Sequence, residues 1–208
     1  MKNILFFLLL ILPCWLVAQF GIKAGLNFSN VTETSSINNS SETGFNIGLF
    51  LAPPSKKIIS SKTELIFSRQ GYNYKSGTNT GNVNLSYIML PTYMCINITK
   101  YFQIHFGMQM AYLINAKADS TTSSGSENPI NDVMKYYNRF DYGYGGGVEV
   151  HPINGLVIGS RINISLAKLY SDALTGQMPS FSSVDVKNNL FQLYAGWKFG
   201  KNESKKKK

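Results

Sequence analysis

Large apolar residues alternate with small or polar ones along most of the chain from Gln19 onward, and this period of two constrains the fold more than any other feature. The clearest run spans residues 102–115 and has a large apolar residue at every second position: Phe102, Ile104, Phe106, Met108, Met110, Tyr112 and Ile114. A period of two places successive side chains on opposite faces of a β-strand, whereas a helix repeats every 3.6 residues. The sequence therefore predicts an all-β fold.

Eight such segments follow one another, and the connections between them alternate in length. The segments span residues 20–29, 44–51, 59–71, 85–97, 102–115, 139–150, 156–166 and 191–199. The short connections span 52–57, 97–100 and 151–155, and the long ones span 30–43, 72–84, 117–138 and 168–189. A strand needs about 9–11 residues to cross a bilayer, and outer-membrane barrels have short periplasmic turns and longer outer loops. The pattern predicts eight membrane-spanning strands with both ends of the chain in the periplasm.

The chemistry of the two strand faces separates a membrane barrel from a soluble one. The non-apolar face is rich in Gly, Asn and Gln, and charged residues make up only 15% of the chain, against about 25% in soluble domains. A closed barrel satisfies every backbone polar group in lipid, and the interior of an eight-stranded barrel is filled by side chains. We therefore expect an eight-stranded antiparallel up-and-down transmembrane β-barrel with a side-chain-filled lumen. Pro91 removes a backbone donor, so a local break is expected in the fourth segment.

The two ends of the chain differ in character from the barrel region. Residues 1–18 combine a positive start, an apolar run of about 14 residues and a small residue at the end, as a secretory signal peptide does. An uncleaved anchor is the alternative, although about 20 residues are needed for a spanning helix. Residues 19–200 are expected to form the barrel, and residues 201–208 a basic disordered tail. Only Cys95 remains after residue 18, so no internal disulfide is expected.

A set of charged residues falls on the inward face of the predicted strands. Isolated charges are costly inside a barrel surrounded by lipid, so we expect these side chains to pair and plug the lumen. Strand heights place Glu64 near Arg161, and Glu149 near Lys23 and Lys198. The predicted lumen polar network comprises Lys23, Lys62, Glu64, Asp141, Glu149, Arg161 and Lys198. A proton or ion path along the same side chains is the functional alternative.

Aromatic residues concentrate near the strand ends on the apolar face. Outer-membrane barrels carry an aromatic girdle at each membrane interface. The predicted girdles comprise Phe20, Phe102, Trp197 and Phe199 at the end with short turns, and Phe28, Phe67, Tyr112 and Tyr142 at the end with long loops.

The sequence offers little for catalysis, metal binding or cofactor binding. The chain has only two histidines: His105 is predicted to point into the lumen, and His151 begins a short turn. Neither suits the Ser–His–acid set of a lipid-modifying enzyme, and no Cys/His cluster suggests a metal site. The net charge of +9 owes four units to residues 201–208, and nucleic acid is not an expected partner of an exported protein. We expect no enzyme activity and no cofactor.

Several segments together resemble the PorT-type outer-membrane β-barrel proteins of Bacteroidetes. They are Phe20–Asn30, Glu64-Leu65 with Ser68–Gly71, Leu90-Pro91, Tyr112–Lys117, Phe140–Gly143 with Gly145–Glu149, and Phe191–Leu193 with Gly196–Phe199. The chain departs from that pattern at Met89 and Cys95, where the family often has charged residues, and in the basic tail. The resemblance implies the bacterial outer membrane and an eight-stranded barrel. One member is linked to protein secretion, a role that does not transfer on these residues.

The function expected from the sequence is that of a non-enzymatic outer-membrane protein with a structural or accessory role. Its long loops, with aromatic residues such as Tyr136 and Phe181, offer surfaces for a partner. The expected partners are outer-membrane lipid and other envelope proteins. A small-solute channel, a component of a protein secretion system and a lipid-modifying enzyme remain as alternatives.

Overall fold

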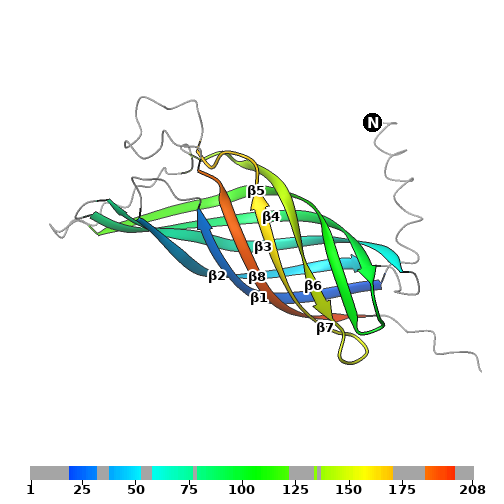
Figure 1. Cartoon of the computed structure of the whole chain (residues 1–208). Helices are drawn as coiled ribbons and strands as arrows, with labels where there is room; N and C mark the ends of the chain where they lie inside the picture. Colours follow the sequence, from blue (N-terminus) through cyan, green and yellow to red (C-terminus); the bar gives the residue numbers. More distant parts are fainter. Residues whose placement is uncertain are drawn as a thin grey trace, which may run out of the picture.

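The computed structural model describes residues 19–31, 38–52, 58–76, 79–121, 134, 137–170 and 186–199. Its strands are β1 (Gln19–Val31), β2 (Asn38–Ala52), β3 (Ile59–Ser76), β4 (Asn79–Asn97), β5 (Phe102–Thr121), β6 (Phe140–Val150), β7 (Leu156–Ser165) and β8 (Asn188–Lys198). They form one closed barrel (Figure 1). The predicted signal peptide (1–18) and basic tail (201–208) lie outside the described residues and remain predictions.

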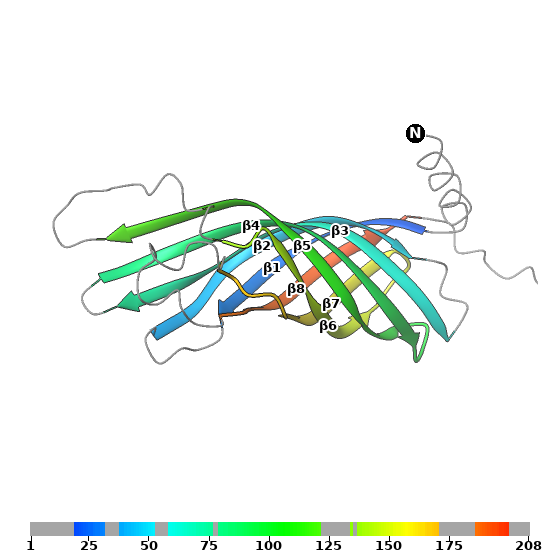
Figure 2. The same ribbon diagram turned by 90° about the horizontal axis from the view of Figure 1, so that it is seen from above.

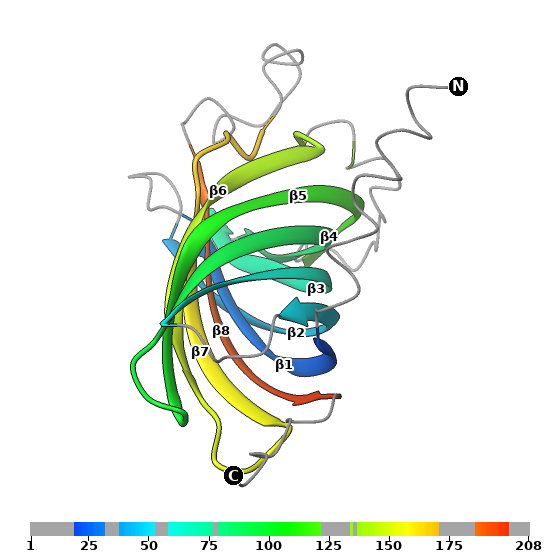
Figure 3. The same ribbon diagram turned by 90° about the vertical axis from the view of Figure 1, so that its right-hand side faces the viewer.

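Each strand pairs antiparallel with the next one in the chain, and β1 pairs with β8 to close the ring (Figure 3). Closure joins the two ends of the described barrel: Gly21 lies opposite Lys198, and the Phe199 N–H donates to the Phe20 carbonyl at 2.7 Å. The prediction of an eight-stranded antiparallel up-and-down barrel is confirmed. Gln19 and Phe199 therefore lie at the same end as the short connections after β2, β4 and β6.

The barrel has an apolar outer wall and polar side chains inside. Ile47 and Met108 are 57% and 76% exposed, whereas Glu64 and Arg161 are each only 1% exposed. This arrangement is the reverse of a soluble barrel, where the apolar face is the core. The described residues include no helix with the length and hydropathy required to cross a membrane.

The strands on one side of the barrel are much longer than those on the other. β3, β4 and β5 have 18, 19 and 20 residues, whereas β6, β7 and β8 have 10 or 11. The prediction of a long loop at 72–84 is therefore wrong, since only residues 77–78 lie between β3 and β4. Tyr72, Val83 and Leu85 are buried and continue the alternation, so polar neighbours such as Asn82 occupy the outer face of a strand. The long strand ends extend beyond the rest of the barrel (Figure 2).

The fourth predicted segment has the expected orientation. Met89, Tyr93 and Cys95 are buried inside, while Leu90 and Met94 are exposed outside. The pairing of β3 with β4 stops at Thr63↔Thr92 and resumes in the same register at Ile66↔Met89, which leaves a gap opposite Pro91. The break expected at this proline is therefore present.

Candidate functional site

A single carboxylate lies at the centre of the polar lumen. Glu64 points inward from β3, is buried, and lies close to three cationic side chains. Its Oε2 accepts from Lys23 Nζ at 2.6 Å and from Arg161 Nη1 at 2.7 Å. Its Oε1 lies 3.3 Å from Lys62 Nζ. Because these side chains come from β1, β3 and β7, the cluster ties distant walls of the barrel together.

A second carboxylate continues the cluster toward the end with short turns. Lys62 pairs with Glu149, which also accepts from the Tyr194 hydroxyl at 2.7 Å. Lys23 Nζ lies 4.0 Å from the centre of the Tyr194 ring, so the aromatic face shares this cation with Glu64. The cluster thus has a formal charge of +1, because it contains three cations and two carboxylates: Lys23, Lys62, Arg161, Glu64 and Glu149.

Strand height correctly predicted that Glu64 lies near Arg161, but Glu149 pairs with Lys62 and not with Lys23. Lys23 contacts Glu64 instead of Glu149, because its neighbours in β2 and β8 are Gly48 and Gly196. With no side chain at either position, the Lys23 amine can cross β2 and reach β3. The contact of Lys23 with Glu64 was not predictable from the position of each residue along its strand.

A network of amide side chains extends from Arg161 toward the end with long loops. It was not among the predicted site residues. Arg161 Nε donates to Gln192 Oε1 at 2.6 Å, and Gln192 Nε2 donates to Asn27 Oδ1 at 2.8 Å. Asn27 Nδ2 then donates to Ser68 Oγ at 2.9 Å. These residues occupy inward positions in the alternation along their strands, as the charged residues do. The alternation could therefore have identified them.

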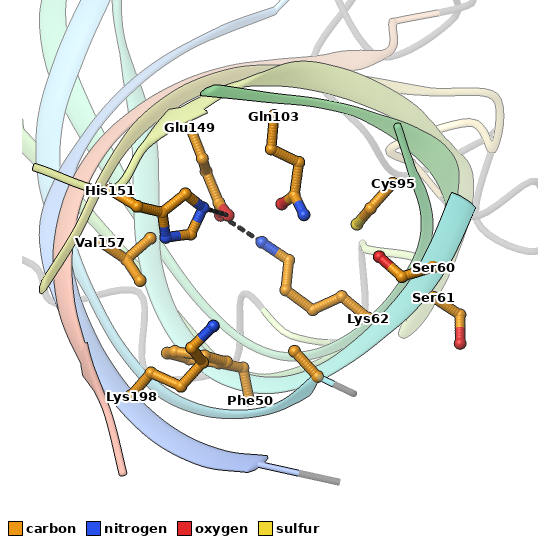
Figure 4. Close-up of a pocket in the computed structure, with 11 residues that line it drawn as sticks. Phe50, Ser60, Ser61, Lys62, Cys95, Gln103, Glu149, His151, Val157 and Lys198 are labelled. Carbon is orange, nitrogen blue, oxygen red and sulfur yellow. Dashed lines mark hydrogen bonds and ion pairs between the residues drawn. The ribbon is translucent and has the colours of Figure 1, made fainter. Parts of the chain in front are cut away.

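Two members of the predicted network lie apart from the central cluster. Asp141 accepts from the Ser165 hydroxyl at 2.6 Å near the end of β7, where it contacts neither Glu64 nor its cations. Lys198 lines the opening at the end with short turns, together with His151 (Figure 4). The structure therefore brings together Lys23, Lys62, Glu64, Glu149 and Arg161.

Apolar and aromatic side chains close the other half of the lumen. The Tyr72 hydroxyl lies 2.6 Å from that of Tyr170 and 2.9 Å from that of Tyr137, so it links β3 to the segments next to β6 and β7. Burial among these rings raises the pKa of Tyr137 well above its usual value. The buried cluster comprises Val31, Ile66, Tyr72, Val83, Leu85, Tyr87, Met89, Ala111, Leu113, Ala116, Tyr137, Leu169, Tyr170, Val186 and Leu190.

The opening at the end with short turns is shallow. It is lined by Lys62, Gln103, Glu149, His151 and Lys198 among others, and has room for about one enclosed water molecule (Figure 4). His151 Nε2 lies 3.9 Å from Glu149 Oε2, and burial lowers the pKa of His151 below its usual value. A cavity of this size does not suit a small-molecule substrate, which needs several hundred cubic ångströms.

His105 and Cys95 lie opposite each other inside the wall formed by β4 and β5. His105 is 1% exposed, and the edge of its ring meets Tyr93 at 5.0 Å between centroids. Among the residues that the structure describes, no three His, Cys, Asp or Glu side chains are grouped so that they could hold a metal ion. His105 therefore faces the lumen and not the lipid.

The residues of the two predicted aromatic girdles all lie on the outer wall. Phe20 and Phe199 stack with ring centroids 6.1 Å apart at the end with short turns, and Trp197 is 42% exposed. At the other end Phe28 contacts Phe191, and Phe67 contacts Phe45. Phe102, Tyr112 and Tyr142 complete the set. Three of these aromatic residues at the two ends, Phe20, Phe28 and Phe67, thus contact another ring across the outer wall.

Comparisons with known proteins agree with this architecture. The family model described as "Outer membrane protein beta-barrel domain" matches residues 16–171. The comparison with curated proteins gave no match. Among solved structures, Ail of Yersinia pestis, crystallised with the heparin analogue sucrose octasulfate, is 19% identical, with a TM-score of 0.52 over 88% of this chain and 99% of Ail. Neisserial surface protein A is 12% identical, with a TM-score of 0.51 over 86% and 97% of the two chains. At these identities the likeness is one of fold.

Proposed function

Because the chain belongs to the outer membrane protein beta-barrel family, we propose that it is a closed, non-enzymatic barrel of the bacterial outer membrane that binds another envelope protein through its long strand ends. Further parts of the proposal are a PorT-type relationship, periplasmic termini and removal of residues 1–18 on export. The observation that carries the partner role is the unequal strand length, since among the described residues the end of β5 has a strand neighbour on one side only.

The lumen argues against transport as the main role. The cluster around Glu64 fills its middle, and the tyrosines at Tyr72, Tyr137 and Tyr170 fill one end. An open channel would need all these buried contacts to separate together. Breaking buried, hydrogen-bonded ion pairs costs several kcal/mol, so spontaneous opening is rare.

Reconstitution into planar lipid bilayers tests this closure. We expect the purified barrel to give no steady single-channel current, because its ion pairs and tyrosines block the axis at two levels. A porin incorporated under the same conditions is the positive control for insertion and recording. Reproducible steady currents from the wild-type barrel would favour the alternative of a small-solute channel.

One strand edge projects beyond its partner. The β5–β6 pairing ends at Tyr112↔Phe140, and the Leu113 N–H donates to the Arg139 carbonyl at 2.7 Å. Beyond this point β5 continues to Thr121, paired with β4 on one side. Of the described residues, none forms a strand against the other side of 114–121. Such an edge presents backbone donors and acceptors on which another chain can add a strand.

Site-specific photo-crosslinking in native outer membranes tests the edge as a docking surface. A photoreactive residue at Asn115, which is exposed on the projecting part of β5, should give a discrete crosslink to another envelope protein. The same residue at Ile104, exposed to lipid on the same strand, is the matched control. Crosslinks of the same mass and yield from both positions, or none from Asn115, would contradict edge docking.

A further inference from the structure

The outer wall of β3, β4 and β5 changes from apolar to polar at one level. On β3 the outward series runs from Leu65 through Phe67 to Arg69, and on β4 it runs from Ile88 to Ser86 and Asn84. Consecutive outward residues on a strand are about 7 Å apart, so Arg69 lies one step above the aromatic girdle. Aromatic girdles mark the membrane interface, so lipid headgroups are expected at this level.

A fixed set of donors occupies this first polar level. Arg69 is exposed, and its Nε and Nη2 both donate to Asn84 Oδ1, at 3.2 and 3.0 Å. Asn84 Nδ2 donates to Asn82 Oδ1 at 2.6 Å, and Asn82 Nδ2 donates to Asn73 Oδ1 at 3.0 Å. The amide row therefore holds the guanidinium against the wall and leaves Nη1 directed away from this contact.

A second cation, Lys117, lies on β5, two strands from Arg69. Lys117 lies directly opposite Asn84 in the β4–β5 register and is exposed on the same face. Directly opposite residues have Cβ atoms about 5 Å apart, so Lys117 on β5 adjoins Asn84 on β4, which in turn accepts from Arg69 on β3. Within the described part of the chain, no carboxylate forms an ion pair with Arg69 or Lys117.

We propose that Arg69, Asn84 and Lys117 form a binding site for the phosphorylated saccharide headgroup of a membrane glycolipid. Arginine and lysine bind phosphate through charge-assisted hydrogen bonds, and Asn84 positions the Arg69 guanidinium for such a contact. The acyl chains of the same molecule would lie on the apolar wall below, against Phe67 and Ile88. This continuity favours a lipid over free phosphate or a soluble polyanion.

The test measures binding of diphosphoryl lipid A and of its dephosphorylated form to the full-length folded barrel in neutral detergent, by native mass spectrometry. A basic side chain at a membrane surface strengthens binding of an anionic lipid about fivefold. We therefore expect the phosphorylated form to bind more tightly, and the double variant Arg69→Gln/Lys117→Gln to lose about twentyfold in affinity for it. Lys100→Gln, an exposed lysine beside Tyr101 at the opposite end, should bind as the wild type does.

Three outcomes would overturn the proposal. They are equal binding of both lipid A forms by the wild type, a loss below about threefold in the double variant, and displacement of the lipid by an equal concentration of inorganic phosphate. Both substitutions are on the outer face, so retention of the heat-modifiable gel shift is the check that the variant barrel is folded.

Discussion

Replacing Glu64 with Gln should lower the free energy of unfolding of the barrel by about 3–5 kcal/mol, the range for loss of one partner from a buried ion pair. Glu64 accepts from Lys23 and Arg161 and also faces Lys62. The amide has nearly the same size but no charge, so among the described residues Glu149 would be the one carboxylate left close to three buried cations. Unfolding in urea, followed by the fluorescence of Trp197 in lipid vesicles, measures the change.

Two further variants identify the cause of that loss. Glu42→Gln removes a carboxylate from the partly exposed end of β2, and we expect a change within about 0.5 kcal/mol. Lys23→Met should destabilise the wild type but recover about 1 kcal/mol or more in the Glu64→Gln background, because it removes an uncompensated cation. A cost below about 1 kcal/mol for Glu64→Gln, or additive effects in the double variant, would contradict a central role for this carboxylate.

The alternation of residue types was sufficient to predict the strands and the side of the wall on which each charged residue lies. Position along the strands predicted that Arg161 meets Glu64, but it did not predict that Lys23 does. Strands in a barrel are tilted and staggered, so residues at equal positions along two strands do not lie at equal heights. Lys23 meets Glu64 only because Gly48 and Gly196 beside it have no side chains, and this depends on the register with both neighbouring strands.

The prediction of a long loop at residues 72–84 was wrong for a different reason. Residues 72–84 are rich in Asn, Ser, Thr and Gly, which are typical of loops. Above the level of the lipid, however, the outer face of a strand is in water and is polar as well. The inward residues Tyr72, Val83 and Leu85 still alternate there. They belong to a buried cluster with Tyr137 and Tyr170, which lie far away in the sequence. Sequence alone does not show that those segments supply a core.

A second large loss of stability is expected where neighbouring strands approach each other closely. A methyl group at Gly147 would lie 2.0 Å from the Ser160 carbonyl oxygen and 2.6 Å from Arg161 Cβ. Relief requires β6 and β7 to move apart, which would also shift Arg161 away from Glu64. We therefore expect Gly147→Ala to cost about 1–3 kcal/mol in unfolding free energy, as overpacking of an interior does.

Gly146 supplies a control at the next position of the same strand. It lies on the outer face, where a methyl group would come no nearer than 3.2 Å to the His105 carbonyl oxygen and 3.5 Å to Phe106 Cβ. Gly146→Ala should therefore cost less than about 1 kcal/mol, since only a small displacement is needed. Equal losses for the two variants in the same urea titration would mean that the glycines serve the strand backbone generally. A larger loss at Gly147, reduced when Arg161 is replaced by Met, would locate the strain between that glycine and the central ion pairs.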